Sequence, residues 1–336
     1  MTSSDTGEAT VTSSLTFTSA NWDTAQTVTV TGADDDLIDG TVSSTTTISI
    51  NDASSDNNFD GVADQTVSVS TTDDDVAGFT IAETEGSTGV DESGSTDTFT
   101  VVLNAQPDSN VVLSITSSDT GEATVTSSLT FTSANWDTAQ TVTVTGVDDD
   151  LVDGTVSSTT TISVVDAASD NNFDAVTDQT VSVSTTDDDV AGFTIAETEG
   201  STTVTEAGST DTFTVVLNAQ PDTNVILSLI SGDTGEATVT SSLTFTSANW
   251  DTAQTVTVTG VDDHLVDGTE TTTLTVAVVD VASDNNFDGV ADQTVSVSTT
   301  DDDVAGFTIV ELEGSTTVDE SGSTDTFTVV LNAQPD

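Results

Sequence analysis

The chain has 336 residues, of which 59 are Asp or Glu and none is Lys or Arg, so its formal net charge is −59. Because no side chain can neutralise a phosphate, this composition excludes nucleic acid and anionic membrane surfaces as partners. The hydrophobic share is 34%, and the Val, Ile, Leu and Phe residues stand in alternating runs, which favours folded domains over a disordered chain.

The charge itself is an obstacle to folding. Two carboxylates about 4 Å apart repel by roughly 1 kcal/mol in water and by roughly 4 kcal/mol at an effective dielectric constant near 20. The sequence has no Cys, so we expect hydrophobic cores and bound cations, rather than disulfides, to offset this repulsion. No apolar run reaches membrane-spanning length, and the segment after Met1 lacks the basic and apolar regions of a signal peptide. We therefore expect no membrane insertion and an export signal outside this segment.

The stretch Asp-Asp-Asp-Val-Ala-Gly-Phe occurs three times and sets the organisation of the chain. Its glycines are spaced at 192 − 78 and 306 − 192, which is 114 residues in both cases. This spacing predicts a tandem array of domain-sized repeats. The predicted parts are a partial repeat with the later strands (1–76), two complete repeats (77–190 and 191–304) and a partial repeat with the first two strands (305–336). Met1 takes the place of Ile115 and Leu229 inside a strand pattern, so we expect this start to be a cut through a repeat.

Residues 77–190 predict an all-β repeat. Its short segments are rich in β-branched residues, turn signals separate them about every ten residues, and none has helical periodicity. The seven predicted strands are 78–83, 98–103, 111–115, 129–132, 141–145, 160–164 and 180–183. A bend is expected at 86–94 and a turn at 104–108, where Pro107 presets the backbone. Seven alternating strands predict a seven-stranded immunoglobulin-like sandwich.

One tryptophan recurs in each copy, at Trp22, Trp136 and Trp250. We expect it to anchor the packing beside the strand that follows it. Carbohydrate stacking is the alternative, although a single tryptophan with no aromatic neighbour is a poor platform for a sugar.

Acidic residues gather at fixed places in each repeat. In 77–190 these places are the loop 148–153, the joint 187–189 and the bend at Glu92, and the segment 119–122 can reach the same pole of the sandwich. Ca²⁺ takes six to eight oxygen ligands at about 2.3–2.6 Å, which several carboxylates can supply together. The pattern therefore predicts a calcium site at this pole. The alternative is that the aspartate runs are solvated loops that keep the protein soluble.

Two further acidic features point elsewhere. His264 replaces the third aspartate of the loop in one copy only, so we expect that position to be a peripheral ligand or none. Residues 56–61, repeated at 284–289, match the opening of a calcium loop, but the twelfth position is Val67 rather than an acid. An ordinary loop between the last two strands is the favoured interpretation.

The repeat resembles the Calx-beta domain, the calcium-binding sandwich of sodium/calcium exchangers, integrin β4 and many very large bacterial surface proteins. The matching residues are Val-Asp-Glu-Ser-Gly at 90–94, the strand 141–144 that leads into the acidic loop 148–153, and the closing segment 187–193. The resemblance implies calcium ligands at Glu92, Asp119, Asp148, Asp149, Asp153, Asp187, Asp188 and Asp189. The same positions in the other copies are Glu206, Asp233, Asp262, Asp263, Asp267, Asp301, Asp302 and Asp303, and in the first partial repeat Asp34, Asp35, Asp39, Asp73, Asp74 and Asp75.

The repeat departs from the family at one position. An acidic residue is usual there three residues after Asp153, where this repeat has Val156 and only the third copy has an acid, Glu270. Fewer ions or weaker calcium binding are therefore expected.

The acidic joints and the resemblance favour a structural role. We expect a calcium-stiffened stalk or extender segment of a secreted, repetitive bacterial surface protein, such as an adhesin, a surface layer or an extracellular fibre. Its location would be extracellular or at the cell surface, and its partners would be neighbouring repeats or copies of itself, with any surface or matrix ligand unidentified.

Two alternatives remain open. In one, residues 305–336 of one chain supply the strands that residues 1–76 of the next chain lack, which gives a head-to-tail fibre. In the other, the repeat is a carbohydrate-binding module. No enzyme is expected, because the single His is absent from the other copies and the paired carboxylates stand in open Asp-rich loops.

Overall fold

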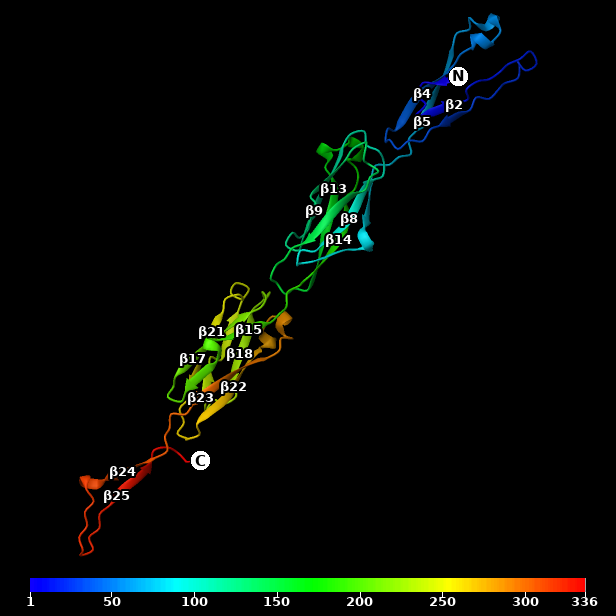
Figure 1. Cartoon of the computed structure of the whole chain (residues 1–336). Coiled ribbons are helices and arrows are strands. Elements are labelled where there is room, and N and C mark those ends of the chain that lie inside the picture. The colour runs from blue at the N-terminus through cyan, green and yellow to red at the C-terminus, as the bar shows by residue number, and fades with distance from the viewer. Residues whose placement is uncertain (336) are drawn as a thin grey trace. The chain divides into compact units, whose positions relative to one another are not determined.

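The computed structural model describes residues 1–335, and these residues form β-strands joined by loops and short turns (Figure 1). No α-helix occurs among them, as the period-2 pattern and the β-branched composition predict. Nine three-residue 3₁₀ turns interrupt the loops in this part of the chain. They are η1 (Asp52–Ser54), η2 (Asn57–Phe59), η3 (Thr84–Gly86), η4 (Asp166–Ala168), η5 (Asn171–Phe173), η6 (Thr198–Gly200), η7 (Asp280–Ala282), η8 (Asn285–Phe287) and η9 (Leu312–Gly314). No helix of residues 1–335 is long and apolar enough to cross a membrane.

The chain divides into two compact units. Unit 1 contains Met1–Asp148 and Val156–Thr186, and unit 2 contains Asp149–Thr155 and the chain from Asp187 onward. Each unit thus holds most of one complete repeat and one partial repeat. The division into four parts at 76, 190 and 304 stays a prediction.

The complete repeat of unit 1 has two sheets. The first has the order β10-β12-β8-β6 and the second the order β11-β9-β13-β14-β7. The strands are β6 (Phe79–Glu83), β7 (Thr88–Asp91), β8 (Thr96–Leu103), β9 (Val111–Ser117), β10 (Ala123–Val125), β11 (Ser128–Phe131), β12 (Gln140–Gly146), β13 (Thr155–Val164) and β14 (Gln179–Thr186).

The complete repeat of unit 2 has the same two-sheet arrangement. Its sheets have the orders β15-β17-β21-β19 and β16-β23-β22-β18-β20. The strands are β15 (Phe193–Glu197), β16 (Thr202–Thr205), β17 (Thr210–Leu217), β18 (Val225–Ser231), β19 (Ala237–Val239), β20 (Ser242–Phe245), β21 (Gln254–Gly260), β22 (Thr269–Val278) and β23 (Gln293–Thr300).

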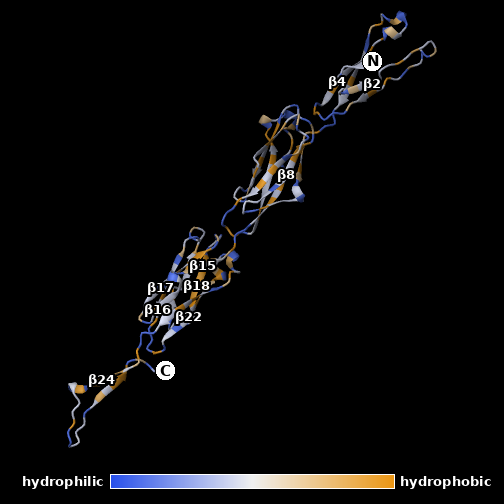
Figure 2. Ribbon diagram, in the orientation of Figure 1, coloured by the Kyte–Doolittle hydropathy of each residue, from blue (hydrophilic) through white to orange (hydrophobic). Residues whose placement is uncertain are grey.

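Alternate residues of both sheets form one core in each complete repeat, which is the packing of a β-sandwich. Figure 2 shows the hydropathy of the residues along these strands. In unit 2 the fully buried members include Phe213 and Val258 from the first sheet and Leu227 and Leu274 from the second. Burial of each such side chain stabilises the fold by roughly 1.5–3 kcal/mol. Trp136 and Trp250 pack against the two cores, which confirms the packing interpretation for these two residues.

The strand count differs from the predicted seven. All seven predicted strands are present in residues 77–190, and two short ones, β7 and β10, are added. β7 lies within the expected bend at 86–94 and pairs in parallel with β14, almost a hundred residues later in the chain. Sequence periodicity gives no sign of such a distant partner, because four residues are too few to show a pattern.

The partial repeats form smaller sheets. Residues 1–76 contain β1 (Thr2–Ser3), β2 (Ala9–Val11), β3 (Val30–Gly32), β4 (Thr41–Ile48) and β5 (Gln65–Thr72), and the last strands are β24 (Phe307–Glu311) and β25 (Phe327–Leu331). The sheets are β1-β4-β5, β2-β3 and β24-β25. Phe307 is 62% exposed, whereas Phe193 at the same place in a complete repeat is 2% exposed. The apolar side chains of the last strand pair are therefore exposed in this chain, as Leu331 at 57% also shows.

Candidate metal centre

The candidate centre of unit 2 lies where two parallel strands end side by side. β16 and β23 are paired with Thr205 opposite Thr300, and the backbone N–H of Glu206 donates to the carbonyl of Thr300 at 3.1 Å. Parallel strands end at the same edge of a sheet, so the residues that follow them meet there. Glu206 and the triplet Asp301–Asp303 are those residues.

A glycine brings a third segment to this edge. A Cβ on Gly260, the last residue of β21, would lie 2.1 Å from the carbonyl oxygen of Thr205, so only glycine allows this approach. The N–H of Gly260 also donates to the carbonyl of Ser209 at 3.0 Å. The acidic loop 262–268, which begins two residues later, is thereby anchored next to Glu206.

Asp301 fixes this loop. It is not a member of the clusters of three carboxylates described below. Its Oδ2 accepts the backbone N–H groups of Asp267 at 3.1 Å and Gly268 at 2.9 Å, and its Oδ1 accepts that of Asp303 at 2.7 Å. These hydrogen bonds, that from Gly268 foremost, hold the pKa of Asp301 below its usual value. Asp301 therefore clamps the loop through these hydrogen bonds, and its role as a calcium ligand stays a prediction.

The first aspartate of the other two triplets is used in the same way. Asp187 accepts the N–H groups of Asp153, Gly154 and Asp189, and Asp73 accepts those of Gly40 and Asp75. Both hold the backbone of their loops, and their roles as calcium ligands stay predictions.

Two groups of carboxylates face one another at this edge. One is Glu206, Asp263 and Asp303, and the other is Glu236, Asp263 and Asp267. In each group one oxygen per residue lies within 4.8 Å of the others, and Asp263 belongs to both. Carboxylates this close repel unless a cation or a proton lies between them. The clustered carboxylate oxygens are the kind of ligand that Ca²⁺ takes.

Glu206 is the clearest candidate for a metal ligand in these groups, because it is buried and its oxygens lack hydrogen-bond partners in the described residues. It is 1% exposed, and within residues 1–335 neither of its carboxylate oxygens has a hydrogen-bond partner. Burial, followed by the negative charges of Asp301 and Asp263, raises the pKa of Glu206 to about 7. The expectation that these acids all stand in open loops is therefore wrong for Glu206.

Two carboxylate oxygens near Glu206 are likewise buried without a hydrogen-bond partner in the described residues. They are Oδ2 of Asp303 and Oε2 of Glu236. Burial and the charges of Asp267 and Asp263 raise the pKa of Glu236. A buried anion without a partner is costly, and metal coordination is one way in which proteins remove that cost.

Glu236 was missed, and Asp233 was predicted in its place. Oδ1 of Asp233 accepts the N–H of Gly235 at 2.8 Å and so closes a local turn. Glu236 follows this turn directly before β19, and Asp119 in unit 1 makes the same turn with Gly121. The sequence signal was present in the Asp-Thr-Gly-Glu segment, where the turn uses the Asp and leaves the Glu.

Two further predicted residues lie beside these groups. Asp302 and Asp262 are exposed and border, with Glu206, a hollow of about 210 Å³. Asp262 also forms a third group with His264 and Asp303, whose ligand atoms lie within 4.8 Å of one another.

The other predicted residues of unit 2 belong to the loop 149–155 and the triplet 187–189. Asp149 and Asp188 are exposed, and Asp189 is half-buried. Burial, followed by the negative charges of Asp187 and Asp149, raises the pKa of Asp153, and Oδ1 of Asp153 has no hydrogen-bond partner within residues 1–335.

Unit 1 repeats parts of this pattern. Glu92 is buried directly after β7, Glu122 is buried directly before β10, and Asp148 is exposed. In the first partial repeat, burial and the charges of Asp39 and Asp35 raise the pKa of Glu8. Burial and the charge of Asp73 raise that of Asp75, with further contributions from Asp36, Asp74 and Asp34.

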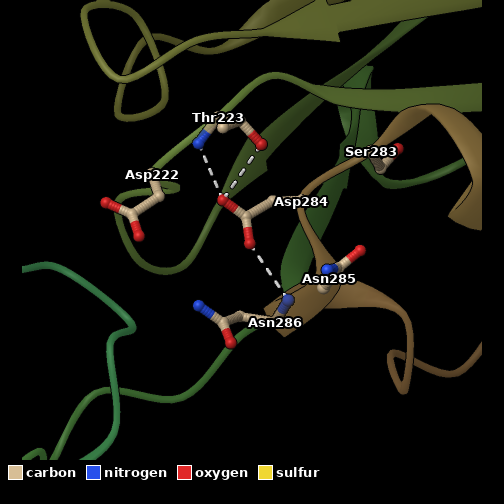
Figure 3. Close-up of a pocket in the computed structure, with 6 residues that line it drawn as sticks. All are labelled: Asp222, Thr223, Ser283, Asp284, Asn285 and Asn286. Atoms are coloured by element: carbon tan, nitrogen blue, oxygen red, sulfur yellow. Dashed lines mark hydrogen bonds between the residues drawn. The ribbon is translucent and has the colours of Figure 1, made fainter.

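The loop that resembles a calcium loop has a different structure. Asp284 is 4% exposed, its Oδ2 accepts the N–H of Thr223 at 2.7 Å, and its Oδ1 accepts the N–H of Asn286 at 3.0 Å as the cap of η8 (Figure 3). Both oxygens thus accept backbone N–H groups, one within the loop and one from Thr223, and Phe287 anchors the loop in the core. This supports the interpretation as an ordinary loop.

Comparison with known proteins gives matches only among solved structures. No family model and no curated protein matches the chain. The crystal structure of CBD12 from CALX1.2 is 14% identical, covers 59% of this chain and 79% of that chain, and has a TM-score of 0.25. The apo-form Calx CBD1 domain is 16% identical, with 33% and 98% covered and a TM-score of 0.25. Domains 4–9 of the surface layer protein SbsC are 18% identical, with 84% of this chain and 38% of that chain covered and a TM-score of 0.27. Because TM-scores this low carry no argument about function, the metal assignment depends on the geometry of the carboxylates.

Proposed function

We propose that the carboxylate groups bind Ca²⁺ and that the bound ions stiffen the joints between successive repeats of an extracellular structural protein. The observation that carries this proposal is Glu206, a buried carboxylate with neither oxygen paired in the described residues and with Asp263 and Asp303 within 4.8 Å. The chain has no Lys or Arg to neutralise this group, so a cation from solution is the partner that we propose for its ionised form.

The loop that carries these ligands also contacts the next repeat. Leu265, between Asp263 and Asp267, forms a parallel bridge with Gln334, whose N–H donates to the carbonyl of His264 at 2.6 Å. One short loop thus holds both the carboxylates and the joint. A cation that fixes Asp263 and Asp267 would restrict the movement of Leu265.

The same joint occurs earlier in unit 2, where the loop 149–155 lies against repeat 191–304. Leu151 forms a bridge with Gln220, Val152 packs against the hydrophobic core, and the side-chain amide of Asn286 donates to the carbonyl of Val152. The acidic loop is therefore a docking element, which supports its role at the joint.

A joint of the same kind occurs within unit 1. Leu37 bridges Gln106, Ile38 packs against the core of repeat 77–190, and Asn172 donates to the carbonyl of Ile38 at 2.8 Å. Recurrence in both units supports a common mechanism for the array.

Calcium titration with magnesium as the control tests the proposal. Extracellular modules bind Ca²⁺ with Kd of about 10⁻⁴–10⁻³ M, and at ten times Kd each site stabilises the folded state by roughly 1.4 kcal/mol. We expect millimolar Ca²⁺ to raise the melting temperature, and Mg²⁺ at equal ionic strength not to do so.

Two matched variants locate the effect. Glu206→Gln removes the buried charge and should reduce the calcium response, whereas Glu199→Gln makes the same change at an exposed turn of the same repeat and should not. Equal responses to both cations, or an unchanged calcium response in Glu206→Gln, would contradict specific calcium binding at Glu206. The carboxylates would then form an acidic surface whose charge any cation screens.

A second candidate function is assembly through the uncovered apolar faces. In complete repeats the counterparts of Phe307 and Leu331 are buried, and in residues 305–331 both are exposed. Strands of a second copy, or strands that follow in a longer polypeptide, could cover this face. A concentration-dependent mass in sedimentation would favour assembly, and a monomer at every concentration would rule it out for this chain.

We propose no catalytic role and no sugar site. The raised pKa of Glu206 resembles that of a general acid, but the hollow beside it is lined by Glu206, Ala207, Gly208, Gly260, Asp262 and Asp302, with no aromatic surface for a sugar ring. A glycan-binding screen and an assay for glycoside hydrolysis would test both exclusions.

A further inference from the structure

His264 is the only histidine in the chain and stands where the two earlier copies of the loop have Asp36 and Asp150. Its position is fixed on both sides. Its carbonyl accepts the N–H of Gln334 at 2.6 Å, and the N–H of Leu265, the next residue, donates to Oδ1 of Asp263 at 2.7 Å. The imidazole is therefore presented from a constrained part of the loop.

Two carboxylates lie close to this imidazole. A ring nitrogen of His264 and one oxygen each of Asp262 and Asp303 lie within 4.8 Å of one another. Asp262 and His264 are exposed, which gives an ion access, and Asp303 is half-buried. Its Oδ2 is buried and has no hydrogen-bond partner within residues 1–335.

A buried side chain without a hydrogen-bond partner in the described residues lies next to two of these three residues. Glu206, 1% exposed, has an oxygen within 4.8 Å of an oxygen of Asp303, and it borders with Asp262 the hollow of about 210 Å³. Two members of the His264 group, Asp262 and Asp303, thus lie next to a buried carboxylate without a hydrogen-bond partner in the described residues, which an exposed acidic loop alone would not provide.

We propose that Asp262, His264 and Asp303 form a site for a first-row transition ion, with Zn²⁺ as the best match, next to the calcium groups. Ca²⁺ takes oxygen ligands, whereas imidazole nitrogen favours Zn²⁺, Ni²⁺ and Cu²⁺. Two carboxylates and a neutral imidazole balance a divalent charge, and three protein ligands leave the fourth tetrahedral position of Zn²⁺ to water. The copies with Asp36 and Asp150 lack the nitrogen ligand, so the site is particular to this repeat.

Zinc titration of the full chain in excess Ca²⁺ tests the site. Because the chain has one histidine, its imidazole proton resonances can be followed by NMR without overlap. We expect the first equivalent of Zn²⁺ to shift these resonances and isothermal titration to detect one tight equivalent.

Variants then assign the ligands. His264→Asp introduces the residue of the other copies, so the loop should keep its fold, and we expect it to weaken the tight equivalent at least about tenfold. Asp262→Asn should do the same, and Asp251→Asn, an exposed acid outside all three groups, should not. Unmoved imidazole resonances, or a tight equivalent retained in His264→Asp, would overturn the proposal. The calcium response of His264→Asp, measured separately, shows whether the calcium groups function independently of this site.

Discussion

Asp284 and Glu206 are two acidic side chains that the same repeat buries, with 4% and 1% of their surface exposed. Asp284 has backbone N–H groups on both oxygens, whereas Glu206 has no hydrogen-bond partner on either oxygen within residues 1–335 (Figure 3). The first is a completed structural element and the second is a group that requires a cation or a proton. In a chain this acidic, unsatisfied burial distinguishes a candidate ligand better than the density of carboxylates does.

The largest effect on stability is expected at Asp284, whose two oxygens both accept hydrogen bonds. Asp284→Ala removes a buried carboxylate that accepts the N–H groups of Thr223 and Asn286, so we expect a loss of about 2–4 kcal/mol in the free energy of unfolding, because hydrogen bonds to charged groups contribute more than neutral ones. Urea unfolding measures this loss, which should be the same with and without Ca²⁺. Asp288→Ala, an exposed acid of the same loop, is the control and should change little. A loss that calcium restores would mean that Asp284 is a ligand after all.

The clamp at Asp301 should have a smaller and more local effect. Asp301→Asn places an amide where one oxygen now accepts two N–H groups, so the amides of Asp267 and Gly268 should lose protection from hydrogen exchange. Asp302→Asn, its exposed neighbour, should leave them protected. Since hydrogen bonds lower the pKa of Asp301 below its usual 3.8, its stabilisation is present above that value and is lost as the pH falls through the lower pKa of the folded state. Unchanged protection of these two amides in Asp301→Asn would show that Asp301 does not hold the loop.

A pH dependence of opposite sign is expected from Glu206. Its pKa is about 7 in the folded state against an ordinary 4.5, so without Ca²⁺ the folded state is favoured at low pH and loses stability as the pH rises from 4.5 to 7. Calcium must then displace the proton, and we expect proton release on binding at pH 6.5 but little at pH 8. Titration calorimetry in buffers of different ionisation enthalpy measures this release. Equal heats in all buffers at pH 6.5 would show that calcium binding displaces no proton from Glu206.

The smallest effect is expected at the docking residue. Val152 packs against the core of repeat 191–304 from the acidic loop, and Val152→Ala should cost about 1 kcal/mol or less of stability. Thermal melting with Val190→Ala, a highly exposed valine, as the control measures the difference. Equal melting temperatures for the two variants would mean that the contact does not hold the loop.

The all-β character and the local strands follow from the sequence. Alternating runs such as 98–103 and 141–145 lie within the observed strands β8 and β12 because their burial on one face shows directly as period 2. The parallel strands β7 and β16 could not be predicted, since each has four residues and its partner lies far away in the chain.

The site was predicted as a region rather than as a ligand set. Asp301 and Asp303 are identical residues two positions apart, yet one binds backbone N–H groups and the other faces Glu206 and Asp263. Their roles depend on which residue first follows the end of β23, a matter of register that composition does not record. Glu206 was among the predicted ligands, but its burial, which depends on the pairing of β16 with β23 and on the approach of Gly260, could not be predicted from the sequence.

The most direct test measures whether calcium restricts the joint between repeats. The chain has no Cys, so Thr124→Cys in unit 1 and Thr238→Cys in unit 2, both exposed, provide the only two sites for spin labels. We expect Ca²⁺, but not Mg²⁺ at equal ionic strength, to narrow the distribution of distances between the labels. Glu92→Gln, at the position 114 residues before Glu206, should abolish the narrowing, and Glu199→Gln should preserve it. Distributions of equal width with and without Ca²⁺ would contradict a calcium-stiffened joint.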